Sequence, residues 1–248
     1  MPDAPKIEVR PAADDVARLA ADRFVSLAER TLDVQETFTV GLAGGSTPKA
    51  MYELLASDEY KNKVEWARVE IFFGDERTVG PDHPDSNFAM AKAALLDHVG
   101  VPGDNLYRMK GELEPAEAAA AYDALLKDKF GTDAGDPGLD LLLLGMGDDA
   151  HTLSLFPETE ALTAGDDRLC VANHVPQKDT WRITLTAAFA NRSRHVDALI
   201  VGKAKAGALN AVLEGDHDPR HRPMQLIAPT MGSFTILADI AATDMDEA

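Results

Sequence analysis

One pattern recurs along the chain and constrains the fold more than any other feature. A short apolar, β-prone run ends at a glycine turn, and segments with apolar residues at helical spacing lie between the runs. Strands that alternate with helices predict an α/β fold of three layers, in which helices cover both faces of a mostly parallel sheet, as in Rossmann-like proteins. Four runs have this form, at residues 38–42, 69–73, 139–144 and 196–201.

Other segments complete the expected organisation. Residues 182–186 and 234–238 are also β-prone, and we expect them either to extend the main sheet or to form a small side sheet. The length of 248 residues suits one domain, residues 1–248. We expect surface loops at 131–138 and 215–222, a fraying tail at 241–248, and a helix stop at Gly215. Helices are predicted over residues 14–30, 49–55, 86–98, 115–130 and 203–214.

The charge of the chain narrows the classes of partner. The formal net charge is −18, with 42 acidic residues against 24 Lys and Arg, and a field of that sign repels nucleic acids and anionic membranes. A phosphorylated small molecule is repelled at long range as well. A phosphate site in this chain therefore needs a local cluster of cations and backbone N–H groups.

Cysteine usage and the N-terminal segment indicate a compartment. Cys170 is the single cysteine, which excludes an intramolecular disulfide and suits a reducing environment; we read it as a small apolar residue. The first residues lack the pattern of a secretory signal, and no apolar run approaches membrane-spanning length. We expect a cytoplasmic protein, present as a monomer or a small homo-oligomer.

The turn after residues 38–42 is the first of three unusual turns. In parallel α/β sheets, ligands bind beyond the carboxyl ends of the strands, so these turns are candidate sites. Here Gly44 and Gly45 precede Ser46 and Thr47, either of which could cap a helix whose first turn contains Pro48. Free N–H groups and hydroxyls would then point at an anion. The alternative is an ordinary tight turn between a strand and a helix.

The second turn places Asp75, Glu76 and Arg77 directly after residues 69–73. The guanidinium of Arg77 can hold a phosphate through two parallel hydrogen bonds. Alternatively, Arg77 forms a structural ion pair with Asp75 or Glu76. Downstream candidates for the site are His83, Ser86 and Asn87, although Asp85 or Ser86 could simply cap the next helix.

The third turn, residues 145–152, follows the most apolar run and contains His151. A histidine there can act as a general acid or base near neutral pH, with Asp148 or Asp149 as candidates to orient its ring. The alternative is a histidine bonded to backbone at a helix start, with either carboxylate as a cap. Cations also follow residues 196–201, where Lys203 and Lys205 could meet a phosphate near a helix start.

Histidines at residues 217 and 221 invite a metal interpretation that we reject. His217 and His221 are four residues apart and have Asp216 and Asp218 beside them, but Pro219 breaks the helix that would align them. We read this segment as a solvated loop. We therefore expect neither a metal site nor an organic cofactor.

Together these motifs resemble the 6-phosphogluconolactonase family in order and spacing. The resemblance covers the turn at Gly44, the turn at Arg77, residues 145–157, residues 182–186, the pair Gly202 and Lys205, and residues 229–239. It implies a fold similar to the glucosamine-6-phosphate deaminase and ribose-5-phosphate isomerase superfamily. It also implies hydrolysis of 6-phosphogluconolactone to 6-phosphogluconate in the pentose phosphate pathway, without metal or organic cofactor.

The resemblance assigns roles to particular positions. The family's catalytic histidine falls on His151 and its phosphate-binding cations on Arg77 and Lys205. The family's basic pair near residues 176–178 is thinner here, so a substrate role stays open for Lys178 and for Arg182. The family usually has Gly where this chain has Ala150; if that position needs a positive φ, Ala costs strain of about 1 kcal/mol. The other expected substrate contacts are Gly44, Gly45, Ser46, Thr47, Asp149 and Arg182.

Two other functions remain as alternatives. A deaminase or aldose–ketose isomerase of the same superfamily would share the phosphate site, but residues 152–157 resemble lactonases rather than the Asn-Glu-Pro ending of deaminases. A noncatalytic phosphosugar sensor would need the cations but could lose His151. The presence of His151 beside Asp149 disfavours the sensor, and the acidic surface disfavours a DNA-bound regulator.

Overall fold

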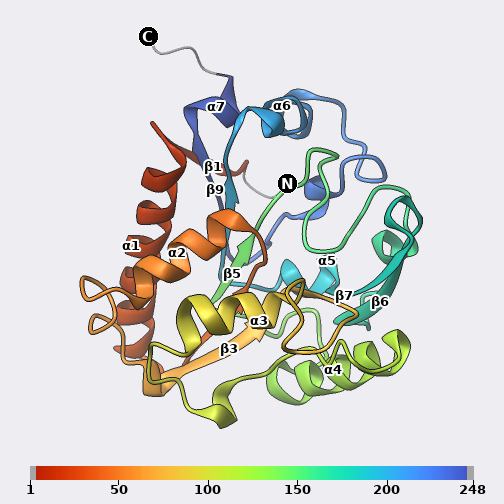
Figure 1. Ribbon diagram of the computed structural model, residues 1–248. Coiled ribbons are helices and arrows are strands. Elements are labelled where there is room, and N and C mark those ends of the chain that lie inside the picture. Colours follow the sequence, from red (N-terminus) through yellow and green to blue (C-terminus); the bar gives the residue numbers. More distant parts are fainter. Residues whose placement is uncertain (1–3, 245–248) are drawn as a thin grey trace.

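Six parallel strands form the main sheet of the protein in a computed structural model that describes residues 4–244 (Figure 1). The strand order is β1-β9-β8-β5-β2-β3, and each neighbouring pair is parallel. All four glycine-terminated runs form strands of this sheet, so the expected α/β fold is confirmed. The strands are β1 (Lys6–Arg10), β2 (Phe38–Leu42), β3 (Val69–Phe73), β5 (Leu141–Leu144), β8 (His195–Ile200) and β9 (Ser233–Asp239).

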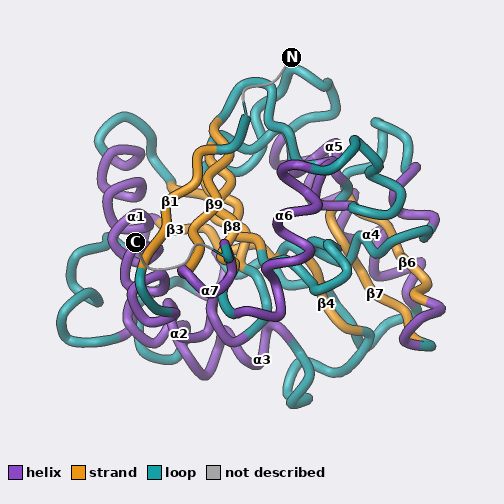
Figure 2. The backbone as a smooth tube through the Cα atoms, turned by 90° about the horizontal axis from the view of Figure 1, so that it is seen from above, coloured by secondary structure: helices purple, strands orange, loops and turns teal. Residues whose placement is uncertain are grey.

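The main sheet is apolar on both faces because helices cover both. Leu141 and Leu143 of β5 pack into one apolar cluster, which contains α1 (Ala13–Leu32) and α2 (Ser46–Ala56). Leu142 and Leu144 point the other way, into a second cluster with α4 (Pro115–Phe130). Figure 2 shows the strands between these groups of helices. Buried on both faces, the strands read as continuous apolar runs in the sequence.

A second, three-stranded antiparallel sheet stands beside the first. Its strands are β4 (Asp75–Arg77), β7 (Thr180–Leu185) and β6 (Cys170–Val175), in the order β4-β7-β6. The chain passes from β3 to β4 through Gly74, whose backbone bonds to both Leu42 of the main sheet and Leu185 of β7. The two late β-prone segments were expected to extend the main sheet or to form a side sheet, and each alternative holds for one of them. Residues 182–186 fall largely in this side sheet, and residues 234–238 lie in the main sheet.

The remaining helices follow the predicted segments with local differences. The helix predicted over residues 86–98 is α3 (Asn87–Ala91) followed by a π-helical turn (Lys92–Leu96), and the one predicted from residue 203 begins with a 3₁₀ turn (Lys203–Lys205) before α6 (Ala206–Glu214). α5 (Ala187–Ala190) was not predicted. Gly215 does end α6, but in an extended rather than a left-handed conformation.

The prediction of a fraying tail is wrong at its start. Residues of α7 (Ile240–Thr243) form a helical turn because the carboxylate of Asp239 accepts a hydrogen bond from the Ala242 N–H. Residues 245–248 of that expectation lie outside the described residues. The loops expected at 131–138 and 215–222 are present. In the described part of the chain, no helix combines the length and apolarity that crossing a bilayer requires.

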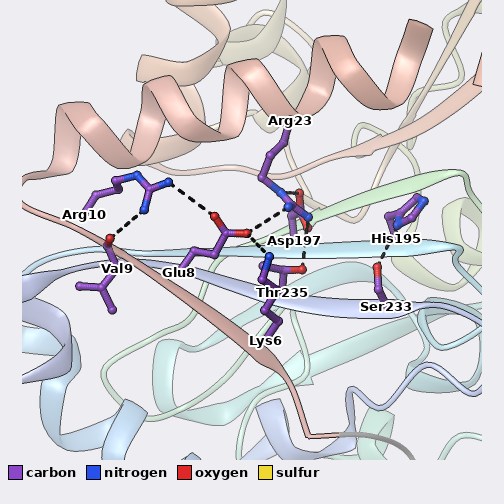
Figure 3. A network of polar contacts seen from close by, with 9 residues as sticks. All are labelled: Lys6, Glu8, Val9, Arg10, Arg23, His195, Asp197, Ser233 and Thr235. Carbon is purple, nitrogen blue, oxygen red and sulfur yellow. Dashed lines mark hydrogen bonds and ion pairs between the residues drawn. The ribbon is translucent and has the colours of Figure 1, made fainter. Parts of the chain in front are cut away.

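A polar network connects α1 to β1, β8 and β9 of the main sheet (Figure 3). Arg23 of α1 donates two hydrogen bonds to the buried carboxylate of Asp197, at 2.7 and 2.8 Å, and a longer one of 3.4 Å to Glu8. Thr235 accepts a further bond from the same guanidinium. A buried carboxylate needs such a partner, so the network fixes how α1 lies on the sheet.

Candidate active site

A cavity of about 300 Å³ lies beyond the carboxyl ends of β2, β5 and β8, where the side sheet meets the main sheet. This is the edge at which open parallel sheets bind ligands. The cavity brings together residues that are up to 162 positions apart in the sequence, from Ala43 to Lys205. The expected site residues among its lining are Gly44, Gly45, Arg77, His151, Arg182 and Lys205.

Three expected substrate contacts do not line this cavity, namely Ser46, Thr47 and Asp149. Ser46 and Thr47 lie in the first turn of α2, and neither caps it, which corrects that expectation. The N-cap is Gly45 with φ of +111°, a backbone conformation that glycine adopts without strain. The substrate contacts of Ser46 and Thr47 stay predictions, and Asp149 contacts His151 instead.

His151 sits on the loop that leaves β5. The N–H of Gly147 donates to the carbonyl of His151 at 2.8 Å, and a Cβ on Gly147 would fall 2.1 Å from Nδ1 of the ring, so only glycine fits there. The imidazole stacks on Phe156, with ring centroids 4.0 Å apart. Its Nδ1 lies 2.5 Å from Oδ1 of Asp149. The loop thus holds the ring by packing on one face and by a carboxylate at one nitrogen.

Asp149 is the carboxylate that orients the histidine, whereas Asp148 forms no hydrogen bond or ion pair with His151. Partial burial penalises the charge of Asp149, but hydrogen bonds from the ring and the backbone N–H of His151 outweigh this and lower its pKa below the usual range. Because the Asp149 carboxylate can only accept a hydrogen bond, Nδ1 of His151 carries the proton. The other ring nitrogen, Nε2, then has a free lone pair. Ala150 adopts φ of +62°, so the condition under which the sequence analysis expected strain at this position is met.

Arg77 and Arg182 face each other across the side sheet, in register on β4 and β7. Burial and the neighbouring charge of Arg77 lower the pKa of Arg182. Arg77 donates to the carbonyl of Asp85 at 2.6 Å, and among residues 4–244 it forms no ion pair with Asp75 or Glu76, so that alternative is wrong. Like charges directly opposite each other on neighbouring strands destabilise a sheet, and a bound anion would offset this repulsion.

Glu76 has a structural task that the sequence did not indicate. Its buried carboxylate accepts hydrogen bonds from the N–H groups of Asn87 and Phe88 at the start of α3, and from the hydroxyl of Ser86. Burial raises the pKa of Glu76, and these hydrogen bonds offset the effect in part. Ser86 itself caps α3 by accepting from Ala89, as one of the two alternatives for Ser86 anticipated. Glu76 does not line the cavity.

Asp75 and Ser154 are cavity residues to which the sequence analysis gave no role in the chemistry. The Ser154 hydroxyl donates to Oδ2 of Asp75 at 2.5 Å, and Asn87, which was expected near the site, donates to Oδ1 at 3.0 Å. Asp75 had been considered only as an ion-pair partner. The available signal was the strand period of two, which places Asp75 on the same face as Arg77.

Lysines complete the lining. Lys205 follows Gly202, whose φ is +92°, and its ammonium forms no ion pair with any described residue. Lys178, whose role the sequence left open, also lines the cavity. Its Nζ lies 5.7 Å from the centroid of the Phe156 ring. Lys203 instead pairs with Asp244 at the surface. The cavity is therefore strongly cationic within a chain of net charge −18.

Between residues 4 and 244, no three His, Cys, Asp or Glu side chains lie together as a metal site would require. His221 bonds to Asp218 at 2.8 Å on an exposed loop, as expected for a solvated segment.

Comparison with known proteins agrees with this geometry. A family model described as glucosamine-6-phosphate isomerases/6-phosphogluconolactonase matches residues 11–236. The chain belongs to this family. A 6-phosphogluconolactonase of Nostoc sp. is 39% identical over 238 residues, which cover 95% of this chain and 96% of the relative.

Solved structures of the family have the same fold. A 6-phosphogluconolactonase from Trypanosoma cruzi superposes with a TM-score of 0.85 at 26% identity, covering 100% of this chain and 99% of the other. A monomeric glucosamine-6-phosphate deaminase of the NagB superfamily reaches a TM-score of 0.82 over 97% of this chain and 100% of the other. At 19% identity, the latter shows only that the two share a fold.

Proposed function

We propose that this protein hydrolyses 6-phospho-D-glucono-1,5-lactone to 6-phospho-D-gluconate. One observation carries the proposal. The His151–Asp149 pair, which leaves Nε2 free as a base, stands at a cavity whose other walls present Arg77, Arg182 and Lys205. A base and an anion anchor in one cavity suit a substrate with a hydrolysable bond and a phosphate. The 39% identity to a 6-phosphogluconolactonase supports the same substrate.

In this mechanism the cations hold the phosphate and the histidine handles the proton. Guanidinium groups bind phosphate oxygens through charge-assisted hydrogen bonds, and Arg77 and Arg182 provide two such groups in register. Lys205, which lines the same cavity, adds a point charge. Anchoring one end of the substrate fixes where its lactone carbonyl lies, which removes much of the entropic barrier to reaction.

The chemical step is attack by water on the lactone carbonyl carbon. Nε2 of His151 takes a proton from the water as its oxygen bonds to that carbon. The imidazolium is stabilised by Asp149, which remains on Nδ1 throughout. The C–O bond of the ring then breaks, and Nε2 returns the proton to the departing ring oxygen. The products are one carboxylic acid, which ionises, and one free hydroxyl on the opened chain.

The test is release of acid from freshly prepared 6-phosphogluconolactone, corrected for spontaneous hydrolysis. We expect the protein to accelerate the release in proportion to its concentration, and NMR to identify 6-phosphogluconate as the product. Glucosamine 6-phosphate serves as the comparison substrate. Acceleration of ammonia release from glucosamine 6-phosphate, with no acceleration of lactone hydrolysis, would overturn the proposal in favour of a deaminase.

We propose further that the reaction occurs in the cytoplasm and uses neither metal nor organic cofactor, in a single-domain protein. Cys170 is the single cysteine of the chain and its thiol is buried, which supports a reducing compartment because such usage is typical of proteins without disulfides. Treatment with a chelator, followed by dialysis, should leave the rate of lactone hydrolysis unchanged. Loss of activity that a divalent ion restores would contradict the metal-free mechanism.

A further inference from the structure

The cavity is rich in donors and poor in acceptors. The Arg and Lys side chains that line it donate hydrogen bonds and cannot accept them. The lactone of the proposed function carries three free hydroxyl groups, each of which needs an acceptor when it leaves water. Among the described residues that line the cavity, Asp75 supplies the one carboxylate. It is therefore the strongest acceptor available to a hydroxyl group of the substrate.

Asp75 is held in place by two buried donors. The hydroxyl of Ser154 bonds to one carboxylate oxygen at 2.5 Å, and the amide of Asn87 bonds to the other at 3.0 Å. Ser154 and Asn87 are 2% and 3% exposed, so neither can swing away. A carboxylate accepts about four hydrogen bonds, and each oxygen of Asp75 therefore keeps capacity for a ligand.

The groups that hold Asp75 are themselves held by buried neighbours. Ser154 donates its N–H to the hydroxyl of Thr184, and its carbonyl accepts from the buried amide of Asn173. The amide of Asn87 packs on Gly44, where an added Cβ would fall 2.0 Å from its oxygen. This close approach requires glycine. The position of the carboxylate is thus set by the segments that contain Gly44, Asn87 and Ser154, all of which line the cavity.

Asp75 also lies at a fixed distance from the proposed phosphate anchor. Asp75 and Arg77 are two residues apart on β4 and so project from the same face of the side sheet. Two residues of a strand span roughly 6.6 Å, a length that a six-carbon substrate bridges between its phosphate and a hydroxyl group. Thr184 lies opposite Asp75, and Arg182 opposite Arg77, which extends the same alternation across β7.

We propose that Asp75 is a specificity-determining residue that accepts a hydrogen bond from a hydroxyl of the phosphosugar lactone. The inference rests on the proposed function, because it concerns the recognition of that same substrate. A hydrogen bond to a charged acceptor is worth roughly 10- to 100-fold in kcat/KM when the site is dry. Asp75 thereby selects polyhydroxylated lactones over lactones that lack the hydroxyl group it contacts.

The experiment is a double-mutant cycle in which one change removes a hydroxyl group of the substrate and the other removes the charge of Asp75. Lactones of 6-phosphogluconate that lack the hydroxyl at carbon 2, 3 or 4 are compared with the parent lactone, in the wild type and in Asp75→Asn. In the wild type, one deoxy lactone should lose about 10- to 100-fold in kcat/KM. In Asp75→Asn, kcat/KM for the parent lactone should fall by a similar factor, and kcat/KM for the same deoxy lactone should be little lower than that.

Two further variants separate recognition from structure. Asp82→Asn removes an exposed carboxylate from the loop after β4, changes the net charge equally, and should retain the wild-type preference. Ser154→Ala frees one oxygen of Asp75 and should weaken the preference in part. Thermal melting of each variant checks the fold. If Asp75→Asn fails to fold, the proposal is still tested by the preference of the wild type for the parent lactone over the deoxy lactones, and by the partial loss of that preference in Ser154→Ala.

The possible results distinguish this inference from the proposed function. Equal kcat/KM for the parent and all three deoxy lactones in the wild type would overturn the inference while leaving lactone hydrolysis standing. So would an Asp75→Asn protein that loses kcat equally on every substrate together with the acid limb of its pH profile, because that result makes Asp75 a base. No acceleration of the parent lactone by the wild type would overturn the proposed function, and the inference with it.

Discussion

Arg77 and Arg182 lie directly opposite each other on β4 and β7, at the edge of the cavity that also contains His151. The charge of Arg77 adds to burial in lowering the pKa of Arg182. Like charges in such a position cost stability in the free protein. A bound dianion removes this cost, and the two guanidinium groups therefore couple ligand binding to folding stability.

The first prediction follows from that coupling. In Arg77→Ala and in Lys205→Ala, 6-phosphogluconate should bind more weakly by about 10-fold or more, because each change removes a charge-assisted hydrogen bond to the phosphate. Binding of unphosphorylated gluconate should change little. Titration calorimetry with both ligands measures the preference. A preference for the phosphorylated ligand that equals that of the wild type in both variants would contradict the anchor.

A second prediction concerns the same anchor without substrate. Inorganic phosphate should raise the melting temperature of the wild type, and less so that of Arg182→Ala, in which the opposing charges are reduced to one. Arg192→Ala is unsuitable as a control, since Arg192 supports the backbone of residues 130–136. Arg18→Ala serves instead, because Arg18 is an exposed partner of Glu59 away from the cavity. Equal phosphate shifts in Arg182→Ala and Arg18→Ala would count against the pair as an anion site.

The third prediction concerns Ala150, where the family usually has glycine. Its φ of +62° costs about 1–2 kcal/mol for a residue with a Cβ. Replacement by glycine removes this strain but loses a buried methyl group worth about 0.8 kcal/mol and adds about 0.4–1 kcal/mol of entropy to the unfolded chain. The free energy of unfolding of Ala150→Gly should therefore differ from that of the wild type by less than about 1 kcal/mol.

Urea denaturation measures this balance, and Ala150→Val provides the contrast. A β-branched side chain at positive φ is strained further and overfills a buried site, so Ala150→Val should lose about 2 kcal/mol or more. Equal stability of the glycine and valine variants would show that the turn relaxes around position 150, and that its strain does not limit the histidine loop.

Much of this fold follows from local sequence, and the parts that do not have a physical reason. β2 and β3 occupy the predicted residues because apolar runs that end at glycine need burial on both faces. β1 and β6 were missed because they lie at sheet edges and carry polar residues such as Glu8 and His174, which weaken the apolar pattern. Their strand character comes from pairing with β9 and β7, which a local pattern does not encode.

The site divides in the same way. Arg77, Lys205 and His151 were predicted because each follows a strand of the parallel sheet, and that sheet edge gathers them, whereas Arg182, which lies within β7 of the side sheet, was expected from the family resemblance. The ties between them were not predictable, because they join distant segments: Ser154 bonds to Asp75 across 79 positions, and Glu76 caps a helix that begins 11 residues later. The sequence offered Asp75 as one possible ion-pair partner of Arg77, but in the structure the carboxylate of Asp75 instead accepts hydrogen bonds from Ser154 and Asn87.

The fourth prediction concerns Asp149 and its dependence on pH. Its folded-state pKa is lowered, so the stability it contributes is complete above the ordinary carboxyl pKa and is lost as the pH falls toward the folded-state value. Asp149→Asn should lack this acid-induced loss relative to the wild type. Its kcat should also fall, by no more than the roughly 10²- to 10⁴-fold of general acid–base action, because the ring can adopt the wrong tautomer.

Unfolding in urea at several pH values, together with steady-state kinetics, tests both halves of this prediction. Asp148→Asn is the matched comparison, since Asp148 is the adjacent, exposed carboxylate. A loss of kcat in Asp148→Asn that equals the loss in Asp149→Asn would show that the general charge of the loop matters, rather than the 2.5 Å contact with Nδ1.

The last prediction concerns His151 itself. In the mechanism proposed above, Nε2 removes a proton from the attacking water, a contribution of about 10²- to 10⁴-fold. His151→Ala should lose that factor in kcat, while 6-phosphogluconate, held through Arg77 and Lys205, binds nearly as before. The rate of lactone hydrolysis by the wild type should depend on pH in a way that the residual rate of His151→Ala does not, because the variant lacks the group that carries the proton.

The control is His217→Ala, in which an exposed histidine on the loop after α6 is removed and both the rate and the pH profile should match those of the wild type. His151 also packs on Phe156, so folding of His151→Ala must be verified by its melting curve and by calorimetric binding of 6-phosphogluconate. A variant that folds, binds the product and still turns over at the wild-type rate would remove the histidine from the mechanism. Since Glu76 is committed to capping α3, such a result would leave Asp75 as the carboxylate lining the cavity that could serve as the base.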